Sequence, residues 1–125
     1  MDYRTALVVD DDTSYRQIMH EILTENEWQV IEAATGEEAL MLSEKPDLLV
    51  IDINLGGGMD GWAFARLARD RWPDIGLLFI SGMSQSPQQY DISGLFIMKP
   101  FRLSDFIIAA EQAPRGCPKS NQGLN

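Results

Sequence analysis

Residues 47–52, with the sequence DLLVID, form the stretch that decides the fold. A run of consecutive apolar residues without polar alternation is typical of a strand that is buried on both faces at the centre of a parallel sheet. Amphipathic stretches lie between most of the short apolar runs of the chain, and the further runs are at 5–10, 28–33, 75–81 and 94–98. This order predicts an α/β protein in which helices cover both faces of one parallel sheet.

Residues suited to begin a helix precede the amphipathic stretches. Thr13 or Ser14 can cap a first helix, whose apolar positions follow the helical repeat. Thr35 and Glu38 have the spacing of a capping box, which predicts a second helix that runs to about residue 43. Asp60 can cap a third helix.

Five polar side chains stand where the predicted strands end. They are Asp10, Asp11, Asp52, Ser81 and Lys99. Parallel sheets flanked by helices bind ligands just outside the carboxyl ends of their strands. We therefore expect the five side chains to converge on one cleft.

The chemistry of these side chains favours the transfer of a phosphoryl group with the help of a metal. Three carboxylates within about 5 Å of one another repel by roughly 3 kcal/mol per pair at an effective dielectric near 20, so a cation is needed among them. Oxygen ligands without a nearby His or Cys favour Mg²⁺, which keeps positions open for water and phosphate oxygens. Mg²⁺, the Lys99 ammonium and the Ser81 hydroxyl together suit a phosphoryl group that arrives on one carboxylate.

At these positions the chain resembles the receiver domain of two-component response regulators. The shared segments are VVDDD at 8–12, the DIN and MDG triplets between 52 and 61, Ser81-Gly82, and Lys99-Pro100-Phe101. The resemblance is specific because all of these segments occur in the expected order. It covers the chain from about Ala6 to about Ala113 and implies a flavodoxin-like, doubly wound sheet of five parallel strands in the order 2-1-3-4-5.

The resemblance implies a role for each acidic residue. Asp52 would be the phosphoacceptor, whose carboxylate attacks the phosphorus of a phosphohistidine or a small phosphodonor and forms an acyl phosphate. Asp11 would contact Mg²⁺ directly and Asp10 mostly through water. Asp52 and the backbone carbonyl of Asn54 would complete the metal site. Asp12 is expected to be only a solvated residue ahead of the first helix.

The resemblance also implies a switch around the phosphoryl group. Ser81 would be the switch hydroxyl that bonds a phosphoryl oxygen, although a hydroxyl at a strand end can instead satisfy a backbone group. Lys99 would pair with the phosphoryl group, and its bond to Pro100 would be cis. A snorkelling surface lysine is the alternative. Phe96 would be the switch aromatic, or else an ordinary core aromatic of its strand.

Two segments depart from the family pattern. Leu55 and the glycines at 56–58 replace the usual Met-Pro pair and add one residue, which loosens the expected hold on the Asn54 carbonyl. The segment from Gly82 to Ser93 is several residues shorter than usual and has few apolar positions, so we expect the family's fourth helix to be shortened or absent. Met83 occupies a position that lines the path of the attacking water in the family. An apolar side chain cannot orient water there, which predicts slow loss of the phosphate.

Composition and length limit the other possibilities. We expect one receiver domain at 1–113, with a last helix at about 102–112, followed by a disordered tail at 114–125. The net charge of -9 argues against nucleic acid as a direct partner. The chain has no apolar run long enough to span a membrane, no signal peptide, and a single cysteine, Cys117, that cannot form an internal disulfide. These features favour the cytoplasm.

Two other functions fit part of the pattern. Asp10, Asp12 and Ser14 match the opening motif of haloacid-dehalogenase phosphohydrolases, in which Asp10 would be the nucleophile. Such enzymes need a further acidic pair on a strand end after the lysine, whereas only Asp105 and Glu111 follow here, within the last helix. A receiver-like interaction module that never accepts phosphate is the second alternative.

The sequence therefore predicts a phosphoacceptor receiver rather than an enzyme that turns over a substrate. A histidine kinase or a phosphotransfer protein would phosphorylate Asp52. The phosphorylated chain would lose its phosphate only slowly and would act by binding a downstream protein. His20-Glu21 matches the phosphorylated dipeptide of histidine kinases, but inside the first helix it is expected to be a surface pair.

Overall fold

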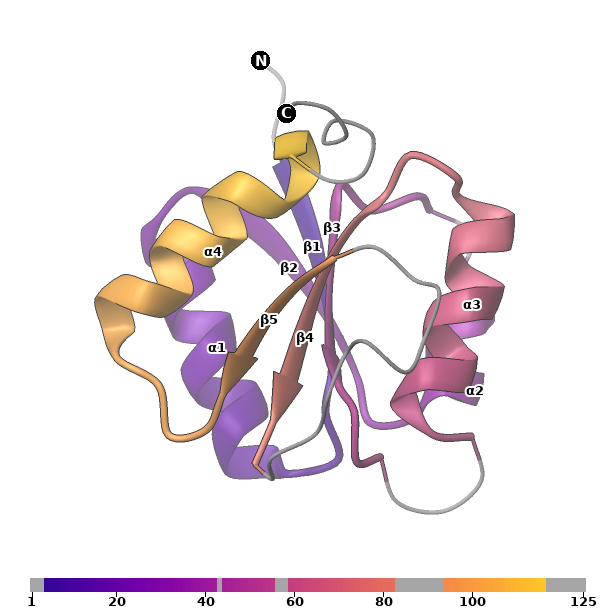
Figure 1. Cartoon of the computed structure of the whole chain (residues 1–125), viewed down its shortest axis with the longest axis horizontal. Coiled ribbons are helices and arrows are strands. Elements are labelled where there is room, and N and C mark those ends of the chain that lie inside the picture. The colour runs from indigo at the N-terminus through magenta and orange to yellow at the C-terminus, as the bar shows by residue number, and fades with distance from the viewer. Residues whose placement is uncertain (1–3, 43, 56–58, 83–93, 117–125) are drawn as a thin grey trace.

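The computed structural model describes residues 4–42, 44–55, 59–82 and 94–116. One sheet of five parallel strands has the order β2-β1-β3-β4-β5 (Figure 1), which confirms the predicted topology. The strands are β1 (Arg4–Val9), β2 (Trp28–Ala33), β3 (Leu48–Asp52), β4 (Gly76–Ser81) and β5 (Leu95–Met98). The helices are α1 (Thr13–Glu25), α2 (Gly36–Leu40), α3 (Gly61–Arg71) and α4 (Leu103–Gly116).

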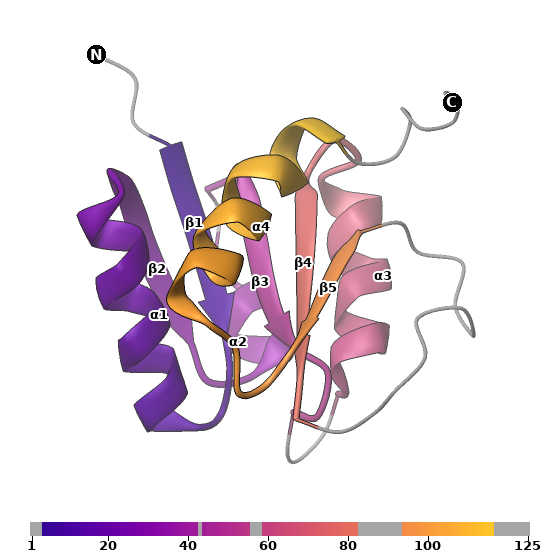
Figure 2. The same cartoon turned by 60° about the vertical axis from the view of Figure 1, so that its left-hand side comes forward.

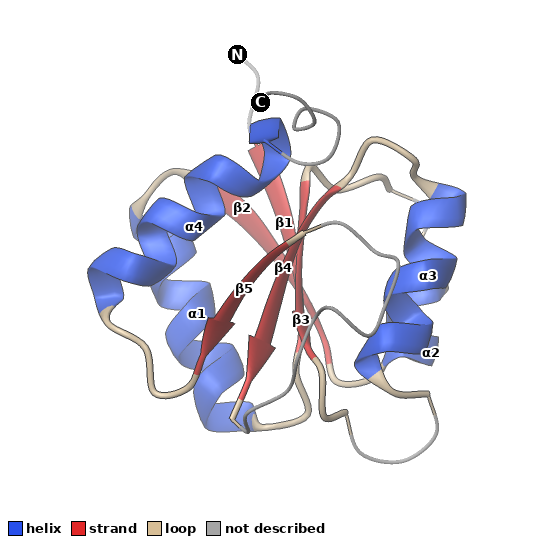
Figure 3. Ribbon diagram, viewed as in Figure 1, coloured by secondary structure: helices blue, strands red, loops and turns tan. Residues whose placement is uncertain are grey.

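Two helical layers cover the sheet, with α1 and α4 on one face and α2 and α3 on the other (Figures 2 and 3). The core beneath α2 and α3 includes the cross-strand neighbours Leu7, Leu49 and Leu77. The core beneath α1 and α4 is built from the next residue of each strand, for example Val8 and Val50. Because side chains alternate along a strand, the apolar runs supply both cores at once.

The predicted strands agree with the observed ones to within one residue at either end. β3 is buried at every position, as expected of a central strand. β5 lies at an edge of the sheet and is only half-buried over Leu95, Phe96 and Ile97, while Met98 is exposed.

The start of α1 differs from the prediction. The N-cap is Asp12, not Thr13 or Ser14, because its Oδ1 accepts hydrogen bonds from the backbone N–H groups of Ser14 at 2.9 Å and Tyr15 at 3.2 Å. The prediction that Asp12 is merely solvated was therefore wrong, although the residue is exposed. A carboxylate at this place also interacts favourably with the positive end of the helix dipole.

The predicted caps of α2 and α3 are confirmed. Thr35 Oγ1 accepts from the N–H of Glu38 at 3.0 Å, and Asp60 Oδ1 accepts from the N–H of Ala63 at 2.8 Å. α2 nevertheless ends at Leu40, before the expected residue 43. Arg71 of α3 donates hydrogen bonds to the carbonyls of Leu40 and Leu42, a long-range contact that satisfies the end of this short helix.

The last helix is longer than predicted. α4 continues to Gly116 instead of ending near 112, and Ala110 and Ala113 extend its buried side along the sheet. The first three residues of the expected tail therefore belong to the helix, and the rest lies outside the described residues. The predicted absence of a full helix between Gly82 and Ser93, the glycine loop at 56–58, and Met83 likewise fall outside the described residues.

Candidate functional site

The predicted site residues meet at the edge where the strands end, at the lower side of Figure 1. Asp52 and Ser81 are the last residues of β3 and β4, Asp10 follows β1 directly, and Lys99 follows β5. Neighbouring strands run in the same direction with matched register, so their carboxyl ends come together. The expected convergence of these side chains is thus observed.

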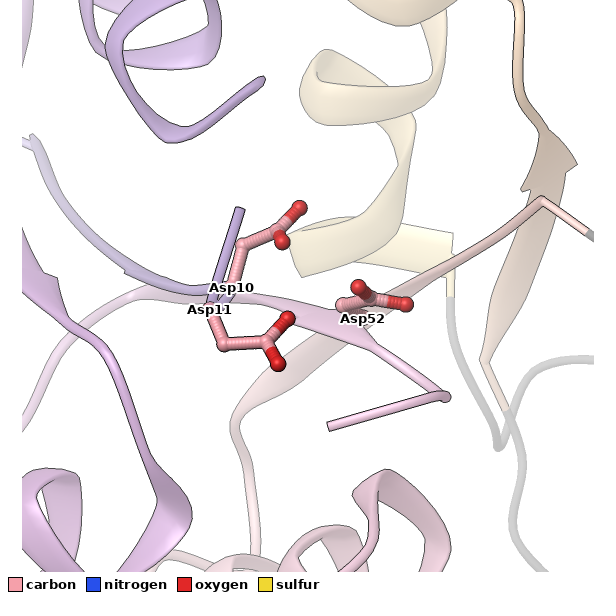
Figure 4. Close-up of side chains that lie close together, drawn as sticks. All are labelled: Asp10, Asp11 and Asp52. Atoms are coloured by element: carbon pink, nitrogen blue, oxygen red, sulfur yellow. The ribbon is translucent and has the colours of Figure 1, made fainter. Parts of the chain in front are cut away.

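Three carboxylates gather at this edge. Figure 4 shows the side chains of Asp10, Asp11 and Asp52 close together, and each offers an oxygen that lies within 4.8 Å of the other two. Asp10 and Asp52 are buried, with exposed fractions of 0% and 5%, while Asp11 is exposed. The cluster therefore has a buried base and one carboxylate open to solvent, an arrangement of hard oxygen donors suited to Mg²⁺.

Lys99 supplies one positive charge to this cluster. Its Nζ lies 3.3 Å from Asp10 Oδ2 and 3.5 Å from Asp52 Oδ2, and its side chain is 13% exposed. One ammonium cannot neutralise three carboxylates, so these four side chains keep an excess of negative charge.

The two buried carboxylates are held in the same way. One oxygen of each accepts a hydrogen bond from the backbone N–H two residues further on: Asp12 donates to Asp10 Oδ1 at 2.9 Å, and Asn54 donates to Asp52 Oδ1 at 3.0 Å. The other oxygen of each faces Lys99. Both carboxylate groups are therefore fixed in orientation before any ligand arrives.

Burial and charge together shift the acid–base behaviour of the site. Burial raises the pKa of Asp10 from 3.8 to about 6, and the negative charge of Asp52 adds to this. The N–H of Asp12 and the charge of Lys99 act against the rise. Burial disfavours the charged form of Lys99, but attraction to Asp10 and Asp52 outweighs it, so the pKa of Lys99 lies above its ordinary value.

The other predicted site residues lie around this centre. Ser81 is fully buried, and its carbonyl accepts from the backbone N–H of Lys99 at 2.7 Å. The Lys99–Pro100 peptide bond is cis, as the resemblance implied. Asn54 is exposed, next to the phosphoacceptor candidate. Phe96 is half-buried and packs against the core beneath α2 and α3.

Two residues near the site were not predicted to take part in it. Gly61 begins α3 so close to the end of β3 that a Cβ atom there would lie 2.5 Å from the Asp52 carbonyl oxygen and 2.6 Å from Ile53 Cα. The MDG triplet in the sequence was the signal for this. Tyr15 places its ring 4.2 Å from Lys99 Nζ. No sequence pattern indicates that contact, since Tyr15 also fits the apolar side of α1.

Two sequence features have no part in this cluster. Glu111 pairs with Arg4, at the opposite edge of the sheet, and among the described residues only Asp11 and Asp52 join Asp10 in a carboxylate cluster. The acidic pair that a dehalogenase-like phosphohydrolase needs is therefore not formed by Asp105 and Glu111. His20 lies beside Glu32 of β2 on the surface, as expected of a surface pair.

Comparison with known proteins identifies the family. A model of the response regulator receiver domain matches residues 6–111. The chain belongs to the response regulator receiver family. This receiver is 31% identical over 117 residues to the transcriptional regulatory protein PdtaR of Mycobacterium tuberculosis, and the match covers 88% of this chain and 56% of PdtaR. The receiver thus spans about half the length of the first curated relatives it matches.

Solved structures agree with the family. The receiver domain of NtrX from Brucella abortus superposes with a TM-score of 0.82 at 28% identity, covering 90% of this chain and 99% of that domain. The chemotaxis protein CheY4 of Vibrio cholerae gives a TM-score of 0.81 at 23% identity with the same coverage, which supports the fold. Within the described parts of the receiver, no helix is long and apolar enough to cross a bilayer.

Proposed function

We propose that this receiver accepts a phosphoryl group on Asp52 in a Mg²⁺-dependent reaction and signals through contacts with other proteins. The observation that carries the proposal is the position of Asp52 on the central strand, between Asp10 after β1 and Ser81 at the end of β4. Asp52 is also within 3.5 Å of the Lys99 ammonium. A nucleophile, a cation and a hydroxyl thus occupy neighbouring strand ends.

The carboxylate cluster fits a divalent cation. Asp10, Asp11 and Asp52 would hold Mg²⁺ together with the carbonyl of Asn54, because oxygens of the three side chains already lie within 4.8 Å of one another. When bound, the ion would neutralise charge and orient phosphoryl oxygens.

The transfer itself requires little chemistry from the protein. A carboxylate oxygen of Asp52 attacks the phosphorus and forms a new O–P bond, while the bond from phosphorus to the donor's nitrogen or oxygen breaks. The donor leaves with that electron pair and is neutralised by a proton from solvent where its chemistry requires one. Lys99 faces the negative charge of the transferred group, and the Ser81 hydroxyl donates a hydrogen bond to it.

The proposed reaction is stoichiometric and has protein partners on both sides. A histidine kinase or a phosphotransfer protein would be the donor, in the cytoplasm, and a downstream protein would recognise the phosphorylated form. The net charge of -9 disfavours direct binding to nucleic acid. Dephosphorylation by the receiver alone would be slow.

The test is incubation with Mg²⁺ and acetyl phosphate, followed by intact-mass measurement. We expect a labile gain of one phosphoryl group, which Asp52→Asn abolishes and EDTA prevents. Asp47→Asn, just before the start of the same strand, is the matched control and should be labelled like the wild type. Phosphate release with transient labelling of Asp10 would instead indicate a phosphohydrolase. No mass gain under any condition would indicate an interaction module.

A further inference from the structure

We propose that Tyr15 is a positioning residue that holds the ammonium of Lys99 against the two buried carboxylates, so that it is already in place when a phosphoryl group arrives. The inference about phosphoryl transfer rests on the proposed function. The inference about the position of the ammonium rests on geometry alone.

The Lys99 ammonium lies close to two carboxylates and to one aromatic ring. Asp10 Oδ2 and Asp52 Oδ2 lie 3.3 Å and 3.5 Å from Nζ, and the ring centroid of Tyr15 lies 4.2 Å from it. The face of an aromatic ring carries partial negative charge and attracts a cation at this distance, most strongly where water is excluded. The Lys99 side chain is 13% exposed, so the contact is largely removed from solvent.

The tyrosine ring is itself held by the core. Its backbone N–H donates to the capping residue Asp12 at 3.2 Å, which fixes the first turn of α1. Its ring contacts Phe101 at a centroid distance of 5.8 Å, and Phe101 stacks on Phe106 at 5.1 Å with an interplanar angle of 18°. Phe106 is fully buried in the core beneath α1 and α4. The ring is therefore part of a rigid wall that extends from α1 to α4.

A fixed wall matters because a lysine side chain is long and flexible. With an aliphatic residue at position 15, the cation–π attraction would be lost, and the ammonium could leave the carboxylates and become hydrated. Phosphoryl transfer would then have to include the ordering of Lys99. With the ring in place, that ordering is complete in the resting protein, which is the usual advantage of preorganised electrostatics.

Three variants separate this role from simple packing. Tyr15→Phe keeps the ring and removes only the hydroxyl. Tyr15→Leu and Tyr15→Met remove the ring but keep apolar bulk. Trp28→Leu is the matched control, because Trp28 stacks in the same way on Arg4, with the guanidinium carbon 4.1 Å from the ring centroid, at the opposite edge of the sheet.

The first measurement is the exchange of the Lys99 ammonium protons with water, followed by NMR of the side-chain nitrogen in metal-free protein without phosphodonor. We expect slow exchange in the wild type, in Tyr15→Phe and in Trp28→Leu, and faster exchange in Tyr15→Leu and Tyr15→Met, in which the ammonium becomes hydrated. Equal exchange in the wild type and the ring-free variants overturns the inference. This arm does not depend on phosphorylation, so it remains decisive if the wild type accepts no phosphoryl group and the proposed function fails.

The second measurement is the rate of phosphorylation by acetyl phosphate at saturating Mg²⁺. Loss of a cation–π contact of ordinary strength predicts a decrease of roughly 2-fold to 30-fold in Tyr15→Leu and Tyr15→Met, with Tyr15→Phe close to the wild type. Trp28→Leu should lower the unfolding temperature without slowing the reaction. Equal damage in Tyr15→Phe and Tyr15→Leu, or a wild-type rate in both ring-free variants, contradicts the proposed role.

Discussion

Charged groups differ between the side of the sheet where the strands begin, here called the amino edge, and the side where they end, the carboxyl edge. At the amino edge, Arg4 pairs with Glu111 at 2.5 Å, donates to the Asn26 carbonyl at 2.7 Å and stacks on Trp28. Both members of that ion pair are more than one-third exposed. At the carboxyl edge, Lys99 is shared among carboxylates, and the two that it contacts are buried.

The difference is one of charge balance and burial. At the amino edge one cation pairs with one anion near water. Desolvation of this ion pair costs little, and the pair contributes modestly to the free energy of unfolding. The carboxyl edge keeps buried charges that are only partly compensated, which lowers the stability of the metal-free protein. An incoming cation and phosphoryl group would find charges that are already fixed in place.

Replacing the cation at each edge should give the largest contrast. Lys99→Met leaves Asp10 and Asp52 buried without their partner, and we expect the free energy of unfolding at neutral pH to fall by about 3 kcal/mol. Arg4→Met should lower it by about 1 kcal/mol, because the exposed pair and the stacking on Trp28 are each weak. Urea unfolding of both variants in metal-free buffer measures the difference. Equal losses would mean that the two edges are energetically alike.

Magnesium should stabilise the carboxyl edge selectively. At a Mg²⁺ concentration 100 times the dissociation constant, mass action predicts a gain of about 2.7 kcal/mol. Asp11→Ala should reduce this gain strongly. Asp12→Ala should leave the gain unchanged, although it lowers the baseline by about 1 kcal/mol through the lost helix cap. Thermal unfolding with increasing Mg²⁺ tests both variants. An equal loss of the Mg²⁺ response in the two would mean that Asp11 is not distinguished from Asp12 as a metal ligand.

The same Asp→Asn substitution should change the free energy of unfolding in opposite directions at the two ends of β3. Asp52→Asn removes repulsion with two carboxylates and one attraction to Lys99, for a net gain of about 2 kcal/mol in metal-free buffer. Asp47→Asn, just before β3, weakens the 2.9 Å hydrogen bond that Asp47 Oδ2 accepts from the N–H of Thr5. It should lower stability by up to about 1 kcal/mol. If both variants were more stable than the wild type, or if neither were, the expected difference between the two ends of β3 would be contradicted.

Acidification should raise the stability of the metal-free protein through the carboxyl edge, because protonation of Asp10 removes a buried negative charge there. The pKa of Asp10 is about 6 in the folded protein, against the ordinary value of 3.8, so the folded state binds more protons between these values. Stability therefore falls as the pH rises through this window. Going from pH 7 to pH 5 without metal should add about 1 kcal/mol from this group. The difference between the wild type and Asp10→Asn isolates the effect, and saturating Mg²⁺ should suppress it.

The sheet was predictable because each strand is a short apolar run and each run has a recognisable end. The same ends predicted the convergence of Asp10, Asp52, Ser81 and Lys99, since parallel strands present their carboxyl ends together. The cis bond at Pro100 followed from the resemblance. These are features that local sequence determines.

One of the missed features is local, and two depend on contacts between distant segments. Residues 12–14 are all able to cap a helix, and Asp12 is selected where its own N–H is held by the carboxylate of Asp10. α2 ends early where Arg71 reaches its carbonyls from the next helix. Tyr15 contacts Lys99, which lies 84 positions further along the chain. No pattern within a short window of sequence reports the contacts of Arg71 and Tyr15.

The close approach of Gly61 to β3 has a consequence for how mutational scans of this protein would be understood. The position carries no side chain and no charge, yet any Cβ there collides with the backbone of Asp52 and Ile53. A substitution must displace the peptide that carries the Asp52 carboxylate. A scan scored only by signalling output would therefore rank Gly61 among the chemical groups of the site, although its contribution is the absence of atoms.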